Sequence, residues 1–333
     1  MLKDFSVPEP DLNKSNILIT GGTGSFGRAF VKSVLSKFKP NKLIVFSRDE
    51  LKQSDMMLEF PASKYPCMRY FLGDIRDLER LKLAVQDVQY VVHAAALKQV
   101  PAAEYNPMEC IKTNVIGAEN IVMASLKAGV SRVISLSTDK AANPINLYGA
   151  SKLASDKIFI AANNLSGENG CRYSVVRYGN VVGSRGSVIP LIKRLLEKKS
   201  DSIPITDPRM TRFWITLDQG VDFVLSCLEL MQGGEIFVPK IPSMKTTDLV
   251  TALAPGVKQV TTGIRPGEKI HETMITVDDA RNTIDMGDRY IIYPAFGSSP
   301  EHKGKPVADG FSYASDSNPE QVSPKLLLQM TKA

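Results

Sequence analysis

The sequence predicts an α/β protein built on a Rossmann-type, doubly wound parallel sheet, with a smaller C-terminal substrate-binding domain. Apolar strand-like runs alternate with helix-like segments through the first half of the chain, which is typical of parallel sheets. A glycine-rich turn directly follows the first apolar run and opens a helix. Beyond about residue 180 the alternation loosens and glycine and proline become frequent.

The first half of the chain supplies six strands and the helices that connect them. The expected strands are 16–20, 42–46, 68–72, 90–93, 132–136 and 173–177. The expected helices are 26–37, 49–60, 77–86, 108–128 and 147–163. This order predicts a nucleotide-binding sheet whose ligands lie beyond the carboxyl ends of the strands.

We divide the chain into three parts. Residues 1–180 form the NADP-binding Rossmann domain and include the catalytic residues. Residues 181–295 form mainly the substrate-binding domain, with segments that could return to the Rossmann domain. Helices are expected at 188–199, 217–231 and 246–253, and a strand at 235–238. The tail 296–333 is rich in glycine, serine, proline and charge, and is expected to be irregular.

Composition excludes several classes of function. The 333 residues are 43% hydrophobic but contain no run of about 18 apolar residues, so no membrane span is expected. The polar N-terminus lacks a signal-peptide core, and four dispersed cysteines with three histidines indicate a reducing cytoplasm and no metal site. The net charge of +6 is interleaved with acidic residues, which indicates a solvated surface and no nucleic-acid partner.

The glycine-rich turn after the first strand predicts a dinucleotide site. Small residues let the backbone approach a pyrophosphate, whose charge then lies at the N-terminus of the next helix. The strand–turn–helix context makes this motif specific. The residues assigned to the turn are Gly21, Thr23, Gly24, Ser25, Phe26 and Gly27.

The end of the second strand indicates which dinucleotide binds. An NAD site usually places an acid there for the ribose 2′-hydroxyl, whereas Ser47 and Arg48 suit the 2′-phosphate of NADP. Asp49 is expected to cap the next helix, with Lys52 one turn further in. The alternative is that Arg48 is an ordinary surface arginine. The stretch assigned to the cofactor comprises Ser47, Arg48, Asp49, Glu50, Leu51 and Lys52.

Two later strand ends belong to the same predicted site. Asp74 and Ile75 follow the third strand and are expected to border the adenine. Ala94 and Ala95 follow the fourth strand and are expected to border the ribose and nicotinamide. His93 ends an apolar strand and is expected to be a core residue.

A cluster of acids and bases follows the fifth strand. Tyr148 and Lys152 stand at i and i+4, on one face of a helix. A lysine there is expected to draw the tyrosine pKa below its usual value of about 10, so that the phenolate can act as a base. Thr138, Asp139 and Lys140 add a hydroxyl and a second acid–base pair, which is one pair more than alcohol oxidation requires.

Taken together, these motifs resemble a known enzyme family. TGGTGSFG, GDIRDLERL, HAAALKQVPAAEYNP, STDKAANPINLYGASK, RYGNVVGSRGSV, ITDPRMTRFWI and GIRPGEKIHE resemble the inverting UDP-N-acetylglucosamine 4,6-dehydratases of bacterial pseudaminic acid biosynthesis. These are extended short-chain dehydrogenases/reductases. The resemblance covers about residues 14–275; it departs at Gln99, where the family often has histidine.

The resemblance implies a dehydration of UDP-N-acetylglucosamine that uses NADP without net oxidation. Tyr148, with Lys152 and Thr138, would remove the proton of the sugar's 4-hydroxyl. Lys140 would take the proton from carbon 5 if burial or a neighbouring cation lowers its pKa, and Asp139 would protonate the departing 6-hydroxyl. The Asp-Lys pair resembles the group that inverts carbon 5; retaining relatives have Asp-Glu.

The resemblance also implies the remaining contacts and the alternatives. Lys98 would lie beside cofactor and substrate, and the other substrate contacts would be Asn180, Arg212, Arg265 and Glu268, with structural ion pairs as their alternative. A homo-oligomer, dimer or hexamer, is expected, packed through helices 108–128 and 147–163. Alternative functions are a dehydratase/epimerase for L-fucosamine-type sugars and a non-catalytic NADP sensor.

Overall fold

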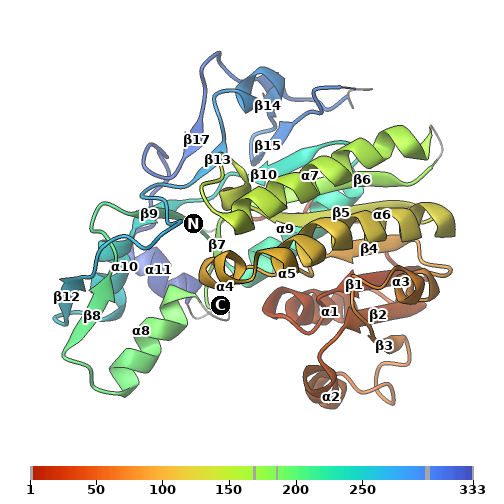
Figure 1. The fold of residues 1–333 in the computed structure, drawn as a ribbon, viewed down its shortest axis with the longest axis horizontal. Helices are drawn as coiled ribbons and strands as arrows, with labels where there is room; N and C mark the ends of the chain where they lie inside the picture. Colours follow the sequence, from red (N-terminus) through yellow and green to blue (C-terminus); the bar gives the residue numbers. More distant parts are fainter. Residues whose placement is uncertain (1–2, 168–169, 185–186, 297–300, 332–333) are drawn as a thin grey trace.

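A ten-stranded sheet forms the centre of the protein in the computed structural model, which describes residues 3–167, 170–184, 187–296 and 301–331 (Figure 1). The strand order is β3-β2-β1-β4-β5-β6-β10-β15-β14-β16. The parallel strands are β1 (Asn16–Thr20), β2 (Lys42–Ser47), β3 (Met68–Leu72), β4 (Tyr90–His93), β5 (Arg132–Thr138), β6 (Arg172–Tyr178) and β10 (Ile236–Pro239). The strands of the antiparallel edge are β14 (Thr283–Asp285), β15 (Arg289–Ile292) and β16 (Lys305–Pro306).

The predicted doubly wound parallel sheet is confirmed, because β1 pairs in parallel with both β2 and β4. The strand order reverses between these neighbours, and in doubly wound sheets ligands bind beyond the carboxyl ends of the strands at such a reversal. β1 is buried along its whole length, as strands covered by helices on both faces are. β5 continues two residues beyond its expected end and brings Thr138 to the same edge.

Helices cover both faces of the sheet (Figure 1). α3, α6 and α7 pack side by side, and α1 packs against α9. The helices are α1 (Ser25–Lys37), α2 (Glu50–Glu59), α3 (Leu78–Ala84), α4 (Val100–Tyr105), α5 (Pro107–Ile111), α6 (Gly117–Ala128), α7 (Leu147–Ser166) and α9 (Leu217–Leu230), with a 3₁₀ turn η2 (Asp139–Ala141).

The helix expected at 108–128 is interrupted. α5 passes into a π-helical turn, η1 (Lys112–Ile116), before α6 begins. Single π turns frequently occur at functional sites, since the extra residue re-aims a side chain. Asn114 in this turn is almost fully buried and bonds the loop after β4. α4, in that same loop, is a helix that the sequence pattern did not predict.

The C-terminal half builds a second, smaller core. The other elements of this half of the chain are β7 (Asn180–Val181), α8 (Val188–Glu197), β8 (Ser202–Ile205), β9 (Thr211–Ile215), β11 (Ser243–Lys245), α10 (Thr246–Leu253), β12 (Lys258–Thr261), β13 (Thr273–Ile275) and η3 (Asp279–Asn282). Trp214 is buried in this core between Ile205 and Leu249, as a packing residue. α8 and α10 end near their expected residues.

The tail contains regular structure where an irregular segment is expected. β17 (Tyr313–Ala314) pairs with β13, and α11 (Pro324–Met330) inserts Leu327 into the smaller core. Ser323 caps this helix by accepting from the Leu326 amide. Residues 297–300 and 332–333, which belong to the same predicted tail, lie outside the described residues.

Candidate active site

The glycine turn lies where the carboxyl ends of β1 and β4 meet. Gly21 has a φ of +64°, and a Cβ at this position would come within 2.9 Å of the Ala95 Cα. A Cβ on Gly27 would lie 2.3 Å from the carbonyl oxygen of Gly22. Only glycine allows these approaches, which bring the first turn of α1 against the strand ends.

The N-terminus of α1 is suited to an anion. Its N-cap, Gly24, supplies no side-chain cap, and the first turn holds no acidic residue. The amides of this turn therefore face the loop with the positive end of the helix dipole. Thr23 is buried in the turn, and Phe26 packs on the main core. The turn fits a dinucleotide diphosphate.

The end of β2 presents a cation and no available acid. Asp49 caps α2 by accepting from the Lys52 amide at 3.0 Å, which confirms its predicted role. The Ser47 hydroxyl accepts a hydrogen bond from the Gln53 side chain at 3.0 Å. Arg48 is half exposed, and its Nη1 lies 3.4 Å from Asp74 Oδ2. A ribose 2′-phosphate would meet positive charge at this edge.

Residues after β3 and β4 complete the predicted cofactor edge. Asp74 forms an ion pair with Arg76 at 2.7 Å, and Ile75 is buried against α6. The amide of Ala95 donates to Thr20 Oγ1 at 3.2 Å, which joins the ends of β1 and β4. Within α2, Leu51 is largely exposed, so its side chain packs little against the protein.

Asn114 fixes the loop that carries Lys98. Its Oδ1 accepts from the Leu97 amide at 2.8 Å, and its Nδ2 donates to the Leu97 carbonyl at 2.9 Å. The same Nδ2 donates to the Ser151 hydroxyl on α7 at 2.9 Å. Burial lowers the pKa of Lys98. Sequence reasoning missed Asn114; an asparagine inside an apolar helical run was the available signal.

The predicted acids and bases are brought together at the end of β5. Asn146 caps α7 by accepting from the Gly149 amide at 2.7 Å, so Tyr148 and Lys152 occupy its first two turns. Thr138 ends β5 and donates to Asp139 Oδ1 at 2.9 Å. All five predicted catalytic residues therefore lie on β5, η2 and α7.

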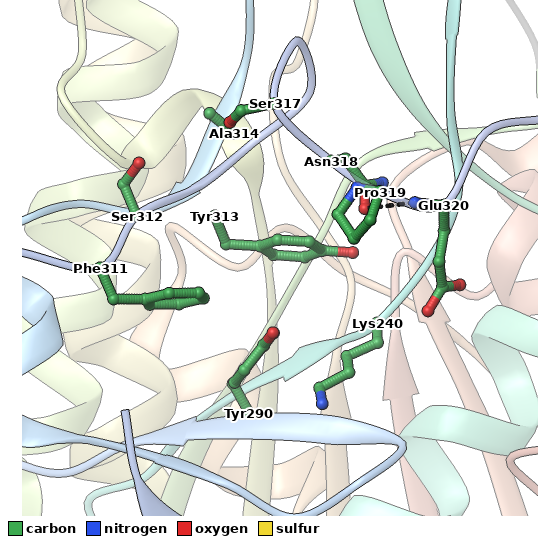
Figure 2. Close-up of a pocket in the computed structure, with 10 residues that line it drawn as sticks. All are labelled: Lys240, Tyr290, Phe311, Ser312, Tyr313, Ala314, Ser317, Asn318, Pro319 and Glu320. Atoms are coloured by element: carbon green, nitrogen blue, oxygen red, sulfur yellow. Dashed lines mark hydrogen bonds between the residues drawn. The ribbon is translucent and has the colours of Figure 1, made fainter. Parts of the chain in front are cut away.

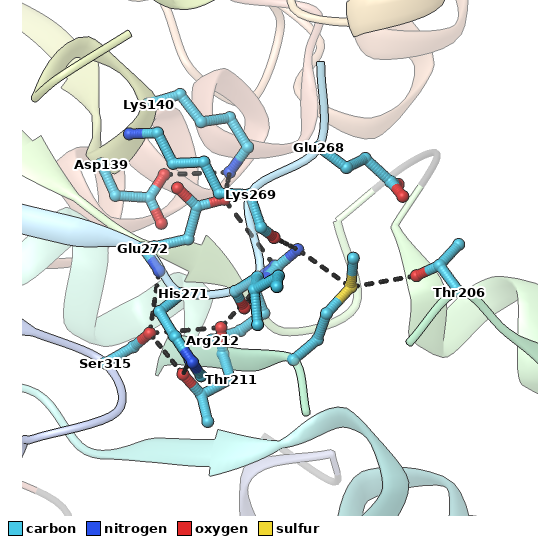
Figure 3. A network of polar contacts seen from close by, with 12 residues as sticks. Asp139, Lys140, Thr206, Thr211, Arg212, Glu268, Lys269, His271, Glu272 and Ser315 are labelled. Carbon is cyan, nitrogen blue, oxygen red and sulfur yellow. Dashed lines mark hydrogen bonds and ion pairs between the residues drawn. The ribbon is translucent and has the colours of Figure 1, made fainter. Parts of the chain in front are cut away.

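Lys140 lies between two buried carboxylates (Figure 3). Its Nζ is 3.0 Å from Asp139 Oδ1 and 3.2 Å from Glu272 Oε1. The two carboxylate side chains are 1% and 2% exposed. Burial alone lowers the pKa of Lys140, but the charges of Asp139 and Glu272 outweigh it and raise that pKa. The expectation of a lowered Lys140 pKa is therefore wrong.

The expected fall in the Tyr148 pKa is also wrong in this structure. Burial raises the pKa of Tyr148 to about 12, although Lys140 and a hydrogen bond with Thr138 oppose the rise. Burial also lowers the pKa of Lys152, which Asp156 partly offsets. The i,i+4 spacing was read correctly, but burial disfavours the phenolate more than the charge of Lys140 and the Thr138 hydrogen bond favour it.

Asp156 lies one turn beyond Lys152 on the buried face of α7. Its Oδ2 accepts from the Ser137 hydroxyl at 2.7 Å and lies 3.5 Å from Arg177 Nη2. Burial raises the pKa of Asp156 against the influence of Arg177 and Lys152. The negative charge of Asp156, which is paired with Arg177, thus favours the charged form of Lys152. His93, also near Lys152, is 1% exposed and lies in the core, where burial lowers its pKa to about 3.

The predicted substrate contacts other than Lys98 come from three segments of the C-terminal half. Asn180 lies on β7, half-buried, opposite Trp214 of β9. Arg265 and Glu268 pair with each other at 3.4 Å. The Arg212 guanidinium donates to backbone carbonyls, including that of Ile270 at 2.9 Å. Their binding of substrate stays a prediction.

Glu272 and Lys269 join this segment to the acids and bases, and sequence reasoning missed both. Lys269 donates to the Ala142 carbonyl at 2.6 Å, directly after η2. Asn146 Nδ2 donates to the Gly267 carbonyl at 2.7 Å. No local sequence pattern pairs residues 140 and 272, which meet only in the folded chain. The one local signal was that Glu272 lies two positions from apolar residues on either side, as on one face of a strand.

A separate cavity of about 240 Å³ lies away from these residues (Figure 2). Aromatic rings of Tyr290, Phe311 and Tyr313 line it together with Lys240. Lys240 lies 4.5 Å above the Tyr290 ring centre and 2.6 Å from Asp285. Ring contacts of Tyr290 with Phe311 and Tyr313 join the tail to the sheet edge, and no predicted site residue lines the cavity.

Membrane-spanning helices and metal-binding groups are both absent from the residues that the structure describes. No helix among them combines the length and apolar character needed to cross a membrane. No three histidine, cysteine, aspartate or glutamate side chains in the described ranges gather into a metal-binding group.

Comparison with known proteins identifies the family of this chain. A family model described as polysaccharide biosynthesis protein matches residues 17–294. The UDP-N-acetylglucosamine 4,6-dehydratase (inverting) of Campylobacter jejuni is 57% identical over 328 residues, covering 96% of this chain and 97% of that protein. The X-ray structure of Pen from Bacillus thuringiensis aligns with a TM-score of 0.88 at 34% identity, covering 96% and 97%.

The fold also matches a more distant enzyme. The dTDP-glucose 4,6-dehydratase DesIV from Streptomyces venezuelae, solved with NAD and TYD bound, aligns with a TM-score of 0.69. The identity is 23%, and the alignment covers 77% of this chain and 86% of that one. This likeness shows the shared Rossmann-type fold.

Proposed function

We infer the function of this chain from its family: the chain belongs to the polysaccharide biosynthesis protein family. Within this family it is a UDP-N-acetylglucosamine 4,6-dehydratase that inverts carbon 5, as its relative of 57% identity is named. The observation that carries this function is Lys140, held at hydrogen-bond distance from Asp139 beside Tyr148 and Thr138. The reaction is a lyase reaction, with loss of one water.

NADP is the cofactor that the residues fit. The turn from Gly21 to Gly27 accepts the diphosphate. The absence of Cβ atoms at its glycines, which lets the backbone pack closely, supports this role. Arg48 and the Ser47 edge favour the 2′-phosphate of NADP over NAD, since Asp49 is occupied as a helix cap. When bound, NADP would supply a reversible hydride acceptor for the sugar, so that the reaction involves no net oxidation.

Tyr148 removes the proton of the 4-hydroxyl during the first step, acting as the phenolate and becoming the phenol. Burial raises its pKa to about 12, so the phenol must first release its own proton to solvent. The positive charge of Lys140 and a hydrogen bond with Thr138 favour that release. Lys152, one turn along α7, completes the pair and orients the sugar and ribose hydroxyls.

Asp139 and Lys140 carry out the elimination. Oxidation at carbon 4 acidifies the proton on carbon 5, and Lys140 takes that proton after its ammonium has given up one of its own. Asp139 gives its carboxyl proton to the 6-hydroxyl, which leaves as water. Return of a proton to carbon 5 from the opposite face gives UDP-2-acetamido-2,6-dideoxy-β-L-arabino-hexos-4-ulose. This product would enter pseudaminic acid biosynthesis.

Substrate contacts come from the segments that meet at this edge. Arg265 and Glu268 bind the nucleotide end, since the exposed Arg265 fork can engage a diphosphate in a bidentate way. Asn180 and Lys98 contact the sugar and phosphate. Arg212 contributes charge and holds the carbonyls of the same segment.

The enzyme works as a homo-oligomer in a reducing compartment, the cytoplasm. Met108, Ile116 and Met123 on the α5–α6 run are exposed apolar side chains, which supports packing of these helices against a second copy. All four cysteines are free thiols. The proposed oligomer is a dimer or a hexamer.

The decisive experiment incubates the protein with UDP-N-acetylglucosamine and NADP in deuterated water. Mass spectrometry should report loss of water, and NMR should report deuterium at carbon 5 with the L-arabino configuration. Absence of a 4-keto product would end the proposal. A further epimerised product would instead favour the enzyme of L-fucosamine-type pathways.

A catalytically silent NADP sensor is the alternative from another class. A Tyr148→Phe variant separates the two functions, because removal of one hydroxyl abolishes proton removal and leaves the cofactor turn unchanged. Unchanged biological activity of this variant would favour the sensor and contradict the catalytic proposal.

A further inference from the structure

We propose that Glu272 is a positioning residue of this dehydration, which holds the amine of Lys140 against Asp139 so that a proton can pass between these two side chains. The inference rests on the proposed function and deepens it. Glu272 comes from a segment about 130 residues away from the other acids and bases, so only the fold brings it to them.

The geometry around Lys140 is a buried three-group arrangement (Figure 3). Nζ lies 3.0 Å from Asp139 Oδ1 and 3.2 Å from Glu272 Oε1. The second oxygen of each carboxylate, Asp139 Oδ2 and Glu272 Oε2, is buried without a hydrogen-bond partner among the described residues. Buried carboxylate oxygens without partners are costly and are kept mainly where they serve a reaction.

The backbone of Glu272 is fixed on both sides. Its amide donates to the Ser315 hydroxyl at 2.9 Å, and its carbonyl accepts from the Ser315 amide at 2.8 Å. The tail thus determines where the carboxylate lies. Lys269, three residues earlier, donates to the Ala142 carbonyl and holds the segment against η2.

Elimination requires a neutral amine and a protonated carboxyl, whereas the resting arrangement is an ammonium between carboxylates. One proton transfer converts this resting arrangement into the reactive one. The Nζ–H bond of Lys140 breaks, its electron pair stays on nitrogen, and an O–H bond forms on Asp139. The number of protons in the site is unchanged. Without Glu272, only the neighbouring Asp139 would hold the long lysine side chain.

Charged and titratable groups face Lys140 from every element packed against it. Asp139 lies on η2, Tyr148 on α7 and Arg212 on β9, while Lys269 and Glu272 belong to the segment before β13. The carboxylate of Glu272 favours the ammonium that forms when Lys140 accepts the carbon-5 proton. A lysine with this partner is therefore the stronger base.

The test compares Glu272→Gln, which keeps the shape but loses the charge, with Glu272→Asp. Glu229→Gln, at an exposed pair with Arg132, serves as the control. We expect Glu272→Gln to lower kcat by about tenfold to a hundredfold, with little change in KM. Its pH–rate profile should move to lower pH, because the Lys140 pKa falls when a negative charge is removed.

Separate readouts distinguish a positioning role from a structural one. Transient absorbance of reduced cofactor should persist in Glu272→Gln, while deuterium incorporation at carbon 5 slows by the same factor as kcat. Glu272→Asp should keep the wild-type pH profile with an intermediate rate. If Glu272→Gln does not fold, Glu272→Asp takes its place. The rate of deuterium exchange at carbon 5 is then divided by the rate of cofactor reduction, and a ratio equal to that of the wild type overturns the inference.

Two failures can be told apart. If the wild-type protein gives no 4-keto product, the proposed function is wrong. If the wild type gives product and Glu272→Gln matches it in rate and pH profile, the function stands and the role of Glu272 is wrong.

Discussion

Gly149 packs directly on the carbonyl oxygen of Lys140, so that a Cβ on Gly149 would lie only 2.2 Å from that oxygen. The first turn of α7 therefore rests on the backbone of η2 without a side chain between them. This contact brings Tyr148 beside Thr138, although the two residues belong to different elements. The close approach of two backbones, more than any single side chain, sets the distance between the two acid–base pairs.

Replacement of Gly149 by alanine should separate these elements. The added methyl cannot be accommodated by rotation of a side chain, since it meets backbone, and overpacking of this kind costs about 1–3 kcal/mol. We expect a lower midpoint in thermal unfolding and a loss of dehydratase activity of about tenfold or more. Activity assays and thermal denaturation measure both effects.

Gly220→Ala is the matched control, because Gly220 lies within α9 and a Cβ there meets nothing within 4 Å. Alanine should stabilise that helix by up to about 1 kcal/mol and leave activity unchanged. Equal effects of both substitutions would contradict the importance of the Gly149 contact.

Arg48 is expected to discriminate between the two dinucleotides. An Arg48→Ala substitution removes a half-exposed guanidinium from the end of β2 and should weaken NADP binding by about tenfold to a hundredfold. NAD binding should change little. Calorimetric or fluorescence titration with each dinucleotide measures the difference.

Arg69→Ala on β3 is a suitable control, since this exposed arginine donates to the nearby carbonyls of Pro66, at 2.7 Å, and Met68, at 2.8 Å. Equal losses of affinity for NADP and NAD in Arg48→Ala would show that Arg48 acts on the diphosphate or on folding, and not on the 2′-phosphate.

Most of the central sheet could be predicted from sequence because each parallel strand is a short apolar run between turn residues. β1 and the glycine turn illustrate this, since their signals lie within twelve consecutive residues. α4 and the π turn around Asn114 were missed for the opposite reason. Their conformation depends on a hydrogen bond between Asn114 and Leu97, seventeen positions apart.

The site could be predicted only as far as local spacing reaches. Tyr148 and Lys152 are one helical turn apart, so sequence placed them correctly. Their protonation could not be predicted, because it depends on burial and on neighbouring charges such as those of Lys140 and Asp156. The sign of the Lys140 shift illustrates the point: burial lowers its pKa, and the charges of Asp139 and the distant Glu272 raise it.

Glu235 should make stability depend on pH in the acidic range. Burial raises its pKa, but hydrogen bonds from His302 and Ser174 outweigh burial and lower it below the usual 4.5. A carboxyl with a lowered folded pKa contributes stability above its unfolded pKa, and this contribution is lost as pH falls through the folded value. Urea unfolding between about pH 3 and 7 should show the loss.

Glu235→Gln isolates this contribution. The variant should be less stable than the wild type at neutral pH, and the difference should shrink as pH falls below about 4.5. Glu79→Gln, at an exposed pair with Lys82, provides the control and should show little difference at any pH. A gap between Glu235→Gln and the wild type that is constant with pH would contradict the assignment.

Lys140→Arg separates the charge of this residue from its chemistry. Arginine keeps a cation between Asp139 and Glu272, so the fold should be retained, but its guanidinium does not lose a proton in the accessible pH range. Cofactor reduction should therefore still be observed as a transient absorbance, while deuterium incorporation at carbon 5 and loss of water should fall by about 10²-fold or more.

Lys140→Gln complements this variant by removing the charge. Two buried carboxylates then lose their cation, so we expect them to take up protons and the protein to unfold more easily at neutral than at acidic pH. The comparison decides between two roles. If Lys140→Arg incorporates deuterium at the wild-type rate, Lys140 serves only as a charge, and another group must remove the carbon-5 proton. If Lys140→Arg reduces the cofactor but does not exchange the carbon-5 proton, Lys140 is the base. The arginine then supplies the same positive charge but no neutral amine that can accept a proton.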